Sequence, residues 1–116
     1  MHPVPPASGC PNDYQHPEIA NERYYVFFDV SRRWVRCSRE VSEFLGYQMD
    51  ELIGHTADKL IPPGVNYNRE VWERFLSDGW IKRFMPLTKK SGHIVGVWVE
   101  YRRLQDGCML AIMRPS

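Results

Sequence analysis

The sequence predicts a single α+β domain, built as a five-stranded antiparallel sheet with short helices and one longer helix on one face. The chain has 116 residues, which is the length of one domain and leaves no room for a second core. Strand patterns lie near both ends of the sequence, and helix patterns are grouped between them. The last three strand candidates are joined by turns too short for a parallel crossover, which predicts antiparallel pairing.

The domain is expected to span residues 22–116, after a proline-rich leader at residues 1–21. The leader holds five of the nine prolines, a composition that disfavours regular structure and predicts a segment that is extended or packed on the sheet. Residues 24–30 and 34–37 are then rich in β-branched and aromatic side chains. A short turn separates them, so they predict a hairpin of the first two strands.

Short helices follow this hairpin. Ser38 stands at an N-cap position, apolar residues follow at helical spacing, and Gly46 supplies a left-handed stop. Further single turns are expected at residues 50–54 and 57–60, and the longest helix at residues 66–78. One apolar stripe on that helix should lie on the sheet. The stripe consists of Tyr67, Val71, Trp72, Phe75 and Leu76.

Three strand candidates complete the chain, at residues 80–87, 93–104 and 108–113. The segments between them, Lys90-Ser91-Gly92 and Gln105-Asp106-Gly107, are typical of hairpin turns. The predicted order is therefore two strands, a group of helices and three strands.

Composition excludes several classes of partner. Fifteen basic and fourteen acidic residues give a net charge of +1, so no overall field attracts nucleic acid or an anionic membrane. No stretch approaches the roughly 20 apolar residues of a membrane span. The three cysteines are odd in number and lack metal-ligand spacing, which argues against a disulfide framework and a zinc site. We therefore expect a cytoplasmic protein with no metal.

No catalytic arrangement is visible, and we predict that the domain is not an enzyme. Asp50 and Glu51 are adjacent, so on a helix they diverge by about 100° and are better explained as acids that favour the positive end of a helix. Cys37 and Cys108 lie in strand patterns and are expected to be buried small hydrophobic residues.

Two stretches of the chain resemble PAS domains, the sensory modules of bacterial signalling proteins. They are DVSRRWVRCSREVSEFLGYQMDELIGHTADKLI at residues 29–61 and KKSGHIVGVWVEYRRLQDGCMLAIMR at residues 89–114. The resemblance covers about residues 24–114 and is most specific at residues 44–54. It implies the strand order 2-1-5-4-3. It also implies an ion pair between Glu51 and Lys90, or its neighbour Lys89.

Strand parity combined with the resemblance locates a set of residues that point toward the helices. The set lines either a ligand pocket or a filled core. It is apolar and offers no charge to hold a carboxylate or phosphate, so a ligand would be small and mostly apolar. Its members are Val26, Phe28, Val71, Phe75, Val97, Val99, Met109, Ala111 and Met113.

The resemblance also bears on cofactors. Photosensing relatives carry a cysteine in an N-C-R-F-L-Q motif just after the position of Gly54, and residues 55–60 of this chain contain no thiol. Haem-binding relatives generally use a histidine on the long helix, which has none here, so His55 is the remaining conceivable iron ligand. We therefore expect neither haem nor covalent flavin chemistry.

Alternation places apolar residues on the other sheet face as well. An exposed apolar patch of this extent marks an interface, so the leader or a second copy of the chain should cover it. The resemblance favours a homodimer on this face. The residues expected there are Tyr25, Phe27, Ile94, Trp98, Leu110 and Ile112, together with Gly96.

These features predict a sensory or regulatory module of a signal-transduction protein. It would sense a small, mostly apolar ligand or the state of a partner, and would transmit that state through dimer contacts. The alternative is a ligand-free module that serves only for protein association. The output domain of such a module, if one follows Ser116, could be a histidine kinase, a cyclic-dinucleotide enzyme or a transcription regulator.

Overall fold

The computed structural model describes residues 19–62, 69–104 and 107–115, and it confirms the predicted α+β architecture. Five antiparallel strands form one sheet in the order β2-β1-β5-β4-β3, as the resemblance implies. The strands are β1 (Tyr25–Phe28), β2 (Trp34–Cys37), β3 (Trp80–Thr88), β4 (Ile94–Arg103) and β5 (Met109–Pro115).

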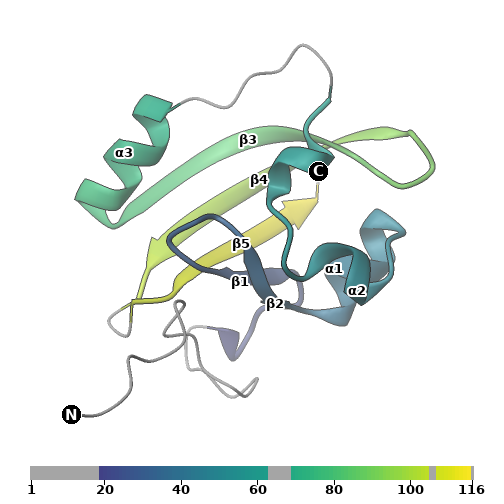
Figure 1. Ribbon diagram of the computed structural model, residues 1–116, viewed down its shortest axis with the longest axis horizontal. Coiled ribbons are helices and arrows are strands. Elements are labelled where there is room, and N and C mark those ends of the chain that lie inside the picture. The colour runs from purple at the N-terminus through teal and green to yellow at the C-terminus, as the bar shows by residue number, and fades with distance from the viewer. Residues whose placement is uncertain (1–18, 63–68, 105–106, 116) are drawn as a thin grey trace.

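The helices lie between β2 and β3 in the chain, as predicted. They are α1 (Arg39–Leu45), α2 (Met49–Leu52), the 3-10 helix η2 (Ala57–Leu60) and α3 (Arg69–Asp78). In Figure 1, α3 lies near one end of the sheet, and α1 and α2 lie near the other. The first residues of the predicted long helix, 66–68, fall outside the described residues.

The caps of α1 form as the sequence predicts. The Ser38 hydroxyl accepts a hydrogen bond from the Val41 N–H at 3.3 Å, and it also accepts one from the Tyr25 N–H at 3.2 Å. Gly46 ends the helix with a φ of 84°, in the left-handed region that favours glycine. Because Ser38 bonds to both elements, it fixes the start of α1 against β1.

The helix-facing side of the sheet carries the main hydrophobic core, which we call the inner face. Buried residues from α1, α2, η2 and α3 join those of the sheet in this cluster, so all four helices pack on one face. Phe75 of α3 is 1 % exposed and Leu45 of α1 is fully buried. The core therefore extends under the helices along the whole sheet.

A smaller cluster lies on the opposite side, the outer face. It consists of Ile19, Tyr25, Phe27, Cys108, Leu110 and Ile112. Cys108 is disulfide-bonded. One disulfide is not a framework, but it differs from the reduced state expected of the cysteines, because an odd count of cysteines still permits one bond. Residues 1–18 of the predicted leader are outside the described residues, whereas Ile19 is buried against the sheet.

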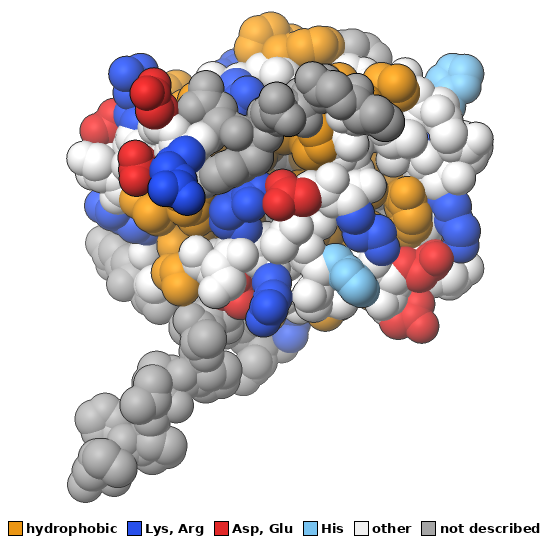
Figure 2. Space-filling model, turned by 45° about the horizontal axis from the view of Figure 1, so that its top comes forward, with side chains coloured by type: hydrophobic (Ala, Val, Ile, Leu, Met, Phe, Trp, Pro, Cys, Tyr) orange, Lys and Arg blue, Asp and Glu red, His pale blue; other side chains and the backbone are white. Residues whose placement is uncertain are grey.

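The surface of the domain carries both signs of charge. Figure 2 shows Lys and Arg side chains interspersed with Asp and Glu over one face, with hydrophobic side chains between them. Of the helices within the described residues, none has the length and apolar character needed to cross a membrane.

Candidate ligand cavity

A cavity of about 110 Å³ opens on the inner face, between the sheet, α3, η2 and the β1–β2 turn. Seven of the nine residues predicted for a pocket line it. Val97 and Met109, at opposite ends of the β4–β5 ladder, are buried in the adjoining core and are not among the lining residues. The seven are Val26, Phe28, Val71, Phe75, Val99, Ala111 and Met113.

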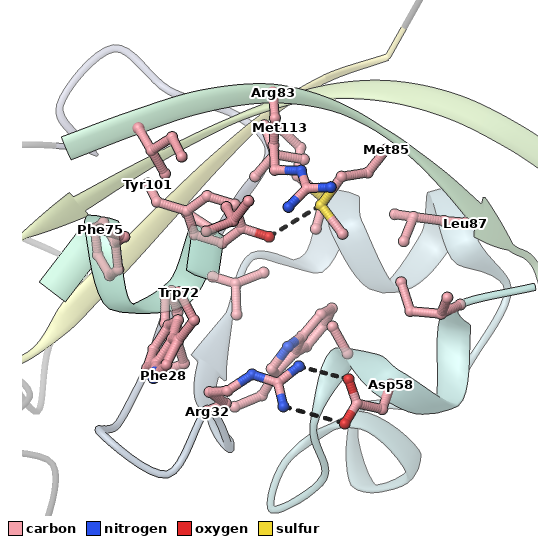
Figure 3. A pocket seen from close by; sticks show the side chains of 18 of the residues that line it. Phe28, Arg32, Asp58, Trp72, Phe75, Arg83, Met85, Leu87, Tyr101 and Met113 are labelled. Carbon is pink, nitrogen blue, oxygen red and sulfur yellow. Dashed lines mark hydrogen bonds and ion pairs between the residues drawn. The ribbon is translucent and has the colours of Figure 1, made fainter. Parts of the chain in front are cut away.

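Aromatic side chains form one wall of the cavity (Figure 3). Phe75 lies at the centre of this wall, with ring centroids 5.5 Å from Trp72, 5.8 Å from Tyr101 and 6.4 Å from Phe28. Phe28 and Tyr101 meet edge to face at 5.8 Å. Aromatic rings in such contact stabilise a fold by more than the burial of their area alone, so the wall is a well-packed apolar surface.

An ion pair forms another wall of the cavity. The guanidinium of Arg32 donates two hydrogen bonds to the Asp58 carboxylate, at 2.5 and 3.2 Å, and so joins the β1–β2 turn to η2. The same guanidinium lies over the Trp72 ring of α3, 5.9 Å from its centroid. Arg32 has a φ of 68°, which is uncommon for a residue other than glycine. Asp29 shapes this turn by accepting from the Ser31 and Arg33 N–H groups.

Arg83 and Tyr101 place polar atoms in the cavity. Figure 3 shows the Arg83 guanidinium directed from β3 into the cavity, toward the Tyr101 hydroxyl. That hydroxyl donates to the thioether sulfur of Met85 at 3.1 Å. Burial raises the pKa of Tyr101 to about 12, although the nearby Arg83 and Arg32 act in the opposite direction. The phenol is therefore protonated, and a donor, at every physiological pH.

The expectation of a pocket without charged groups is therefore wrong, since Arg32, Asp58 and Arg83 all line it. A signal for Arg83 is present in the sequence. Ile81, Met85 and Leu87 face inward from β3, and Arg83 shares their parity. The sequence gives no such signal for Arg32, because its side chain is directed inward by a turn, and a turn has no periodic pattern.

The predicted ion pair between Glu51 and Lys90 is confirmed. The Lys90 ammonium donates to both Glu51 oxygens at 2.9 Å, while Lys89 lies over the Phe44 ring, 5.2 Å from its centroid. The Lys90 N–H also donates to the Leu45 carbonyl at 2.9 Å. The turn between β3 and β4 is thereby held against both α1 and α2.

The outer face is divided into a covered and an open part. Tyr25, Phe27, Leu110 and Ile112, four of the six residues expected in a dimer interface, are already buried within the single chain. They therefore cannot form a surface between two copies in this arrangement. Ile94 and Trp98 of β4 are exposed by 56 % and 46 %.

We call the open part the outer patch, made of Phe84, Ile94 and Trp98. Phe84, 48 % exposed, lies edge to face with Trp98 at 5.4 Å. The Phe84 ring also covers Gly96, where a Cβ atom would approach it to 2.2 Å. Lys82 lies over the other ring of the pair, with its ammonium 5.8 Å from the Trp98 centroid. Phe84 is not among the residues predicted for the outer face. Its parity on β3, alternate to that of Arg83 and Met85, is the signal that places it there.

The remaining candidate ligands lie away from the cavity. Neither His55 nor His93 lines it, and Cys37 is buried beside Met49 with the pKa of its thiol raised by burial to about 11. Across residues 19–62, 69–104 and 107–115, no three His, Cys, Asp or Glu side chains are grouped to hold a metal ion.

The arrangement of the chain is similar to that of several solved domains. The PAS domain of an HTR-like protein from Haloarcula marismortui has a TM-score of 0.67 and 20 % identity, covering 80 % of each chain. A PAS domain from a two-component sensor histidine kinase has a TM-score of 0.70 and 11 % identity, covering 80 % of this chain and 84 % of that one. The light-state LOV domain of the blue-light photoreceptor Aureochrome1 has a TM-score of 0.71 and 14 % identity, covering 90 % and 89 %.

No protein-family model and no curated protein matches the sequence. The structural similarities nevertheless extend over most of the chain and show that it has the PAS fold.

Proposed function

We propose that this domain is a sensory module that binds a small ligand in the inner-face cavity and transmits its occupancy through dimer contacts. The observation that carries the proposal is the cavity itself, a void of about 110 Å³ where a filled core was the alternative. A natural core contains few voids larger than a water molecule, so an unfilled space of this size is a candidate binding site. Neighbours of the same fold include domains of a sensor histidine kinase and of a photoreceptor.

The size of the cavity supports a ligand no larger than one ring. Typical sites for drug-sized ligands are roughly 300 to 1,000 Å³, whereas a dry cavity of about 150 Å³ accepts benzene. A three-ring isoalloxazine is much larger than benzene, so the residues present do not fit a flavin without rearrangement. Of the two cysteines within the described residues neither lines the cavity, and the lining includes no histidine. We therefore propose neither covalent flavin chemistry nor haem for this domain.

The polar groups of the cavity support binding rather than catalysis. Asp58 is held by Arg32, and Tyr101 with a pKa of about 12 is a poor base. Among the described residues that line the cavity there is no serine, cysteine, histidine or lysine. The described lining thus offers no nucleophile with an activating base, and we propose that the domain is not an enzyme.

The outer patch is the proposed site of dimer contacts. Its two aromatic side chains, Phe84 and Trp98, are in edge-to-face contact, and aromatic residues are the type that anchors interfaces. β4 carries residues of both faces, so a ligand that shifts Val99 acts on a strand whose other side exposes Ile94 and Trp98. The output would be a histidine kinase, a cyclic-dinucleotide enzyme or a transcription regulator.

We also propose a cytoplasmic location, although the disulfide of Cys108 is unusual for that compartment, where thiols are kept reduced. The proposal therefore predicts that this bond is absent in the cell. Alkylation of thiols in intact cells, followed by mass measurement of the protein, tests this point.

Toluene is a suitable probe of the cavity because it is apolar and close to benzene in size. In two-dimensional NMR, toluene should shift the indole signals of Trp34 and Trp72, which line the cavity, before those of Trp80 and Trp98 on the outer face. The variant Ala111→Leu places a larger side chain in the cavity and should lose this response while remaining folded.

Two results decide between the proposal and its alternative. A response confined to the cavity tryptophans and lost in the variant supports ligand sensing. Absence of any response in the unmodified protein would favour the ligand-free association module.

A further inference from the structure

We propose that the cavity recognises a small organic monocarboxylate with an apolar body, and that Arg83 and the Tyr101 hydroxyl hold its carboxylate. This inference rests on the proposed function and names the chemical class of the ligand. It follows from one feature that a purely apolar ligand does not explain, namely a cation directed into an aromatic cavity.

Arg83 is the unmatched charge of the cavity. Arg32 is paired with Asp58, and on the outer face Arg102 is paired with Glu100 and Arg114 with Glu22. Arg83 is partly buried on the inner face, and within the part of the chain that the structure describes it has no ion-pair partner. Removing a cation from water is costly unless an anion or hydrogen-bond acceptor compensates. A ligand carboxylate would supply both.

Tyr101 offers a second donor at the same end of the cavity. Its hydroxyl donates to the Met85 sulfur, and a thioether is only a weak acceptor. A carboxylate oxygen is a much better acceptor for a phenol. With a pKa near 12 the hydroxyl keeps its proton, so it donates at any pH at which the ligand is ionised.

The charges of the lining set the charge of the ligand. Arg32 and Asp58 neutralise each other, and Arg83 leaves a net charge of +1 among the lining residues that the structure describes. Arg32 is already engaged by Asp58, so Arg83 is the cation available to a ligand carboxylate. One guanidinium and one hydroxyl match the two oxygens of a single carboxylate. The rest of the lining is mostly apolar and aromatic, and it fits one ring or a short aliphatic chain.

Benzoate and benzamide form a matched pair of probes, because they are nearly identical in shape and differ in charge. Dissociation constants are measured at pH 7 by calorimetry or NMR titration on the unmodified protein. We expect benzoate to bind about 10- to 100-fold more tightly than benzamide, the factor for a hydrogen bond to a charged group. Equal affinities, or tighter binding of benzamide, would overturn the proposal without recourse to any variant.

Three variants assign the preference to its residues. Arg83→Met replaces the aliphatic stem of the side chain, removes the guanidinium and should lower the ratio of the two affinities to about 1. Tyr101→Phe should weaken benzoate about 10-fold and leave benzamide nearly unchanged. Lys82→Met is the matched control, since it removes the same charge from the adjacent, exposed position on the outer side of β3. Its benzoate affinity should remain within about twofold of the unmodified protein.

The failures of the two proposals are distinguishable. If toluene binds and benzoate has no advantage over benzamide, the carboxylate proposal is wrong and ligand sensing stands. If neither toluene nor benzoate binds, ligand sensing itself is wrong. A benzoate preference that Lys82→Met abolishes as fully as Arg83→Met would indicate a long-range effect of net charge, and would also overturn the assignment to Arg83.

Discussion

One added methyl group can establish whether the cavity is usable space. Val97 and Val99 are both buried on β4 with inward side chains, and only Val99 lines the cavity. Changing each to isoleucine adds the same methylene and keeps a β-branched side chain, so strand propensity is unchanged. The two variants therefore differ only in what the new methyl group meets.

The two substitutions are expected to change the free energy of unfolding in opposite directions. At Val99 the methyl group enters the cavity and should stabilise the fold by about 0.8 kcal/mol, the value for one buried methylene. At Val97 it enters a filled core and should destabilise it by about 1 to 3 kcal/mol through overpacking. The variants should thus differ by about 2 to 4 kcal/mol.

Urea denaturation followed by tryptophan fluorescence measures both values, and an unchanged dependence on urea concentration would confirm that the unfolded state is not altered. If Val99→Ile destabilises the protein as much as Val97→Ile, the cavity is not free space. The cavity could then not serve as a ligand site.

Three further outcomes are expected. Trp98→Lys should convert a dimer to a folded monomer in sedimentation equilibrium. Val30→Lys is the control, at a site on the β1–β2 turn that is 56 % exposed, and it should leave the dimer intact. A dimer unchanged by Trp98→Lys would show that the outer patch is not the interface. Phe75→Ala should cost about 3 to 5 kcal/mol in urea denaturation because its ring is 1 % exposed, and a loss below about 1 kcal/mol would contradict its central place in the core. The Gln48 N–H, and then the Lys90 ammonium, hold the pKa of Glu51 below its usual value. The stability that Glu51 provides is therefore present above the pKa of the unfolded chain and is lost as the pH falls through the pKa of the folded protein. Glu51→Gln should reduce this loss of stability in acid relative to Glu43→Gln, and equal losses in the two variants would contradict the pairing.

The fold could be predicted because its signals are local. The cap at Ser38, the stop at Gly46 and the alternation along β4 each specify one element through its own residues. The strand order came from the resemblance to PAS domains, since pairing between β1 and β5 joins segments that no short-range pattern connects.

The candidate site was only partly predictable for the same reason. Parity located the apolar lining, including Phe28 and Ala111, because each strand alternates regularly. It did not distinguish Val99 beside the cavity from Val97 in a filled core, since that difference depends on where α3 and η2 lie over the sheet. The inward side chain of Arg32 depends on a left-handed turn residue, for which an arginine gives no signal.

The covering of the outer face was also beyond the reach of strand patterns. Alternation correctly marked Phe27 and Trp98 as outward residues of the sheet. It could not show that the first is fully buried by its own chain while the second remains exposed, because burial depends on segments that pack across the strands.

Coupling between the cavity and the outer patch is the central claim, and sedimentation equilibrium with and without saturating toluene tests it most directly. Sensing through dimer contacts predicts that toluene changes the dimer dissociation constant of the unmodified protein by about fivefold or more, as a coupling of at least 1 kcal/mol requires. The cavity-filled variant Ala111→Leu should dimerise with a constant that toluene does not change. A dissociation constant unaffected by toluene, in protein whose cavity tryptophan signals show that toluene is bound, would contradict the account.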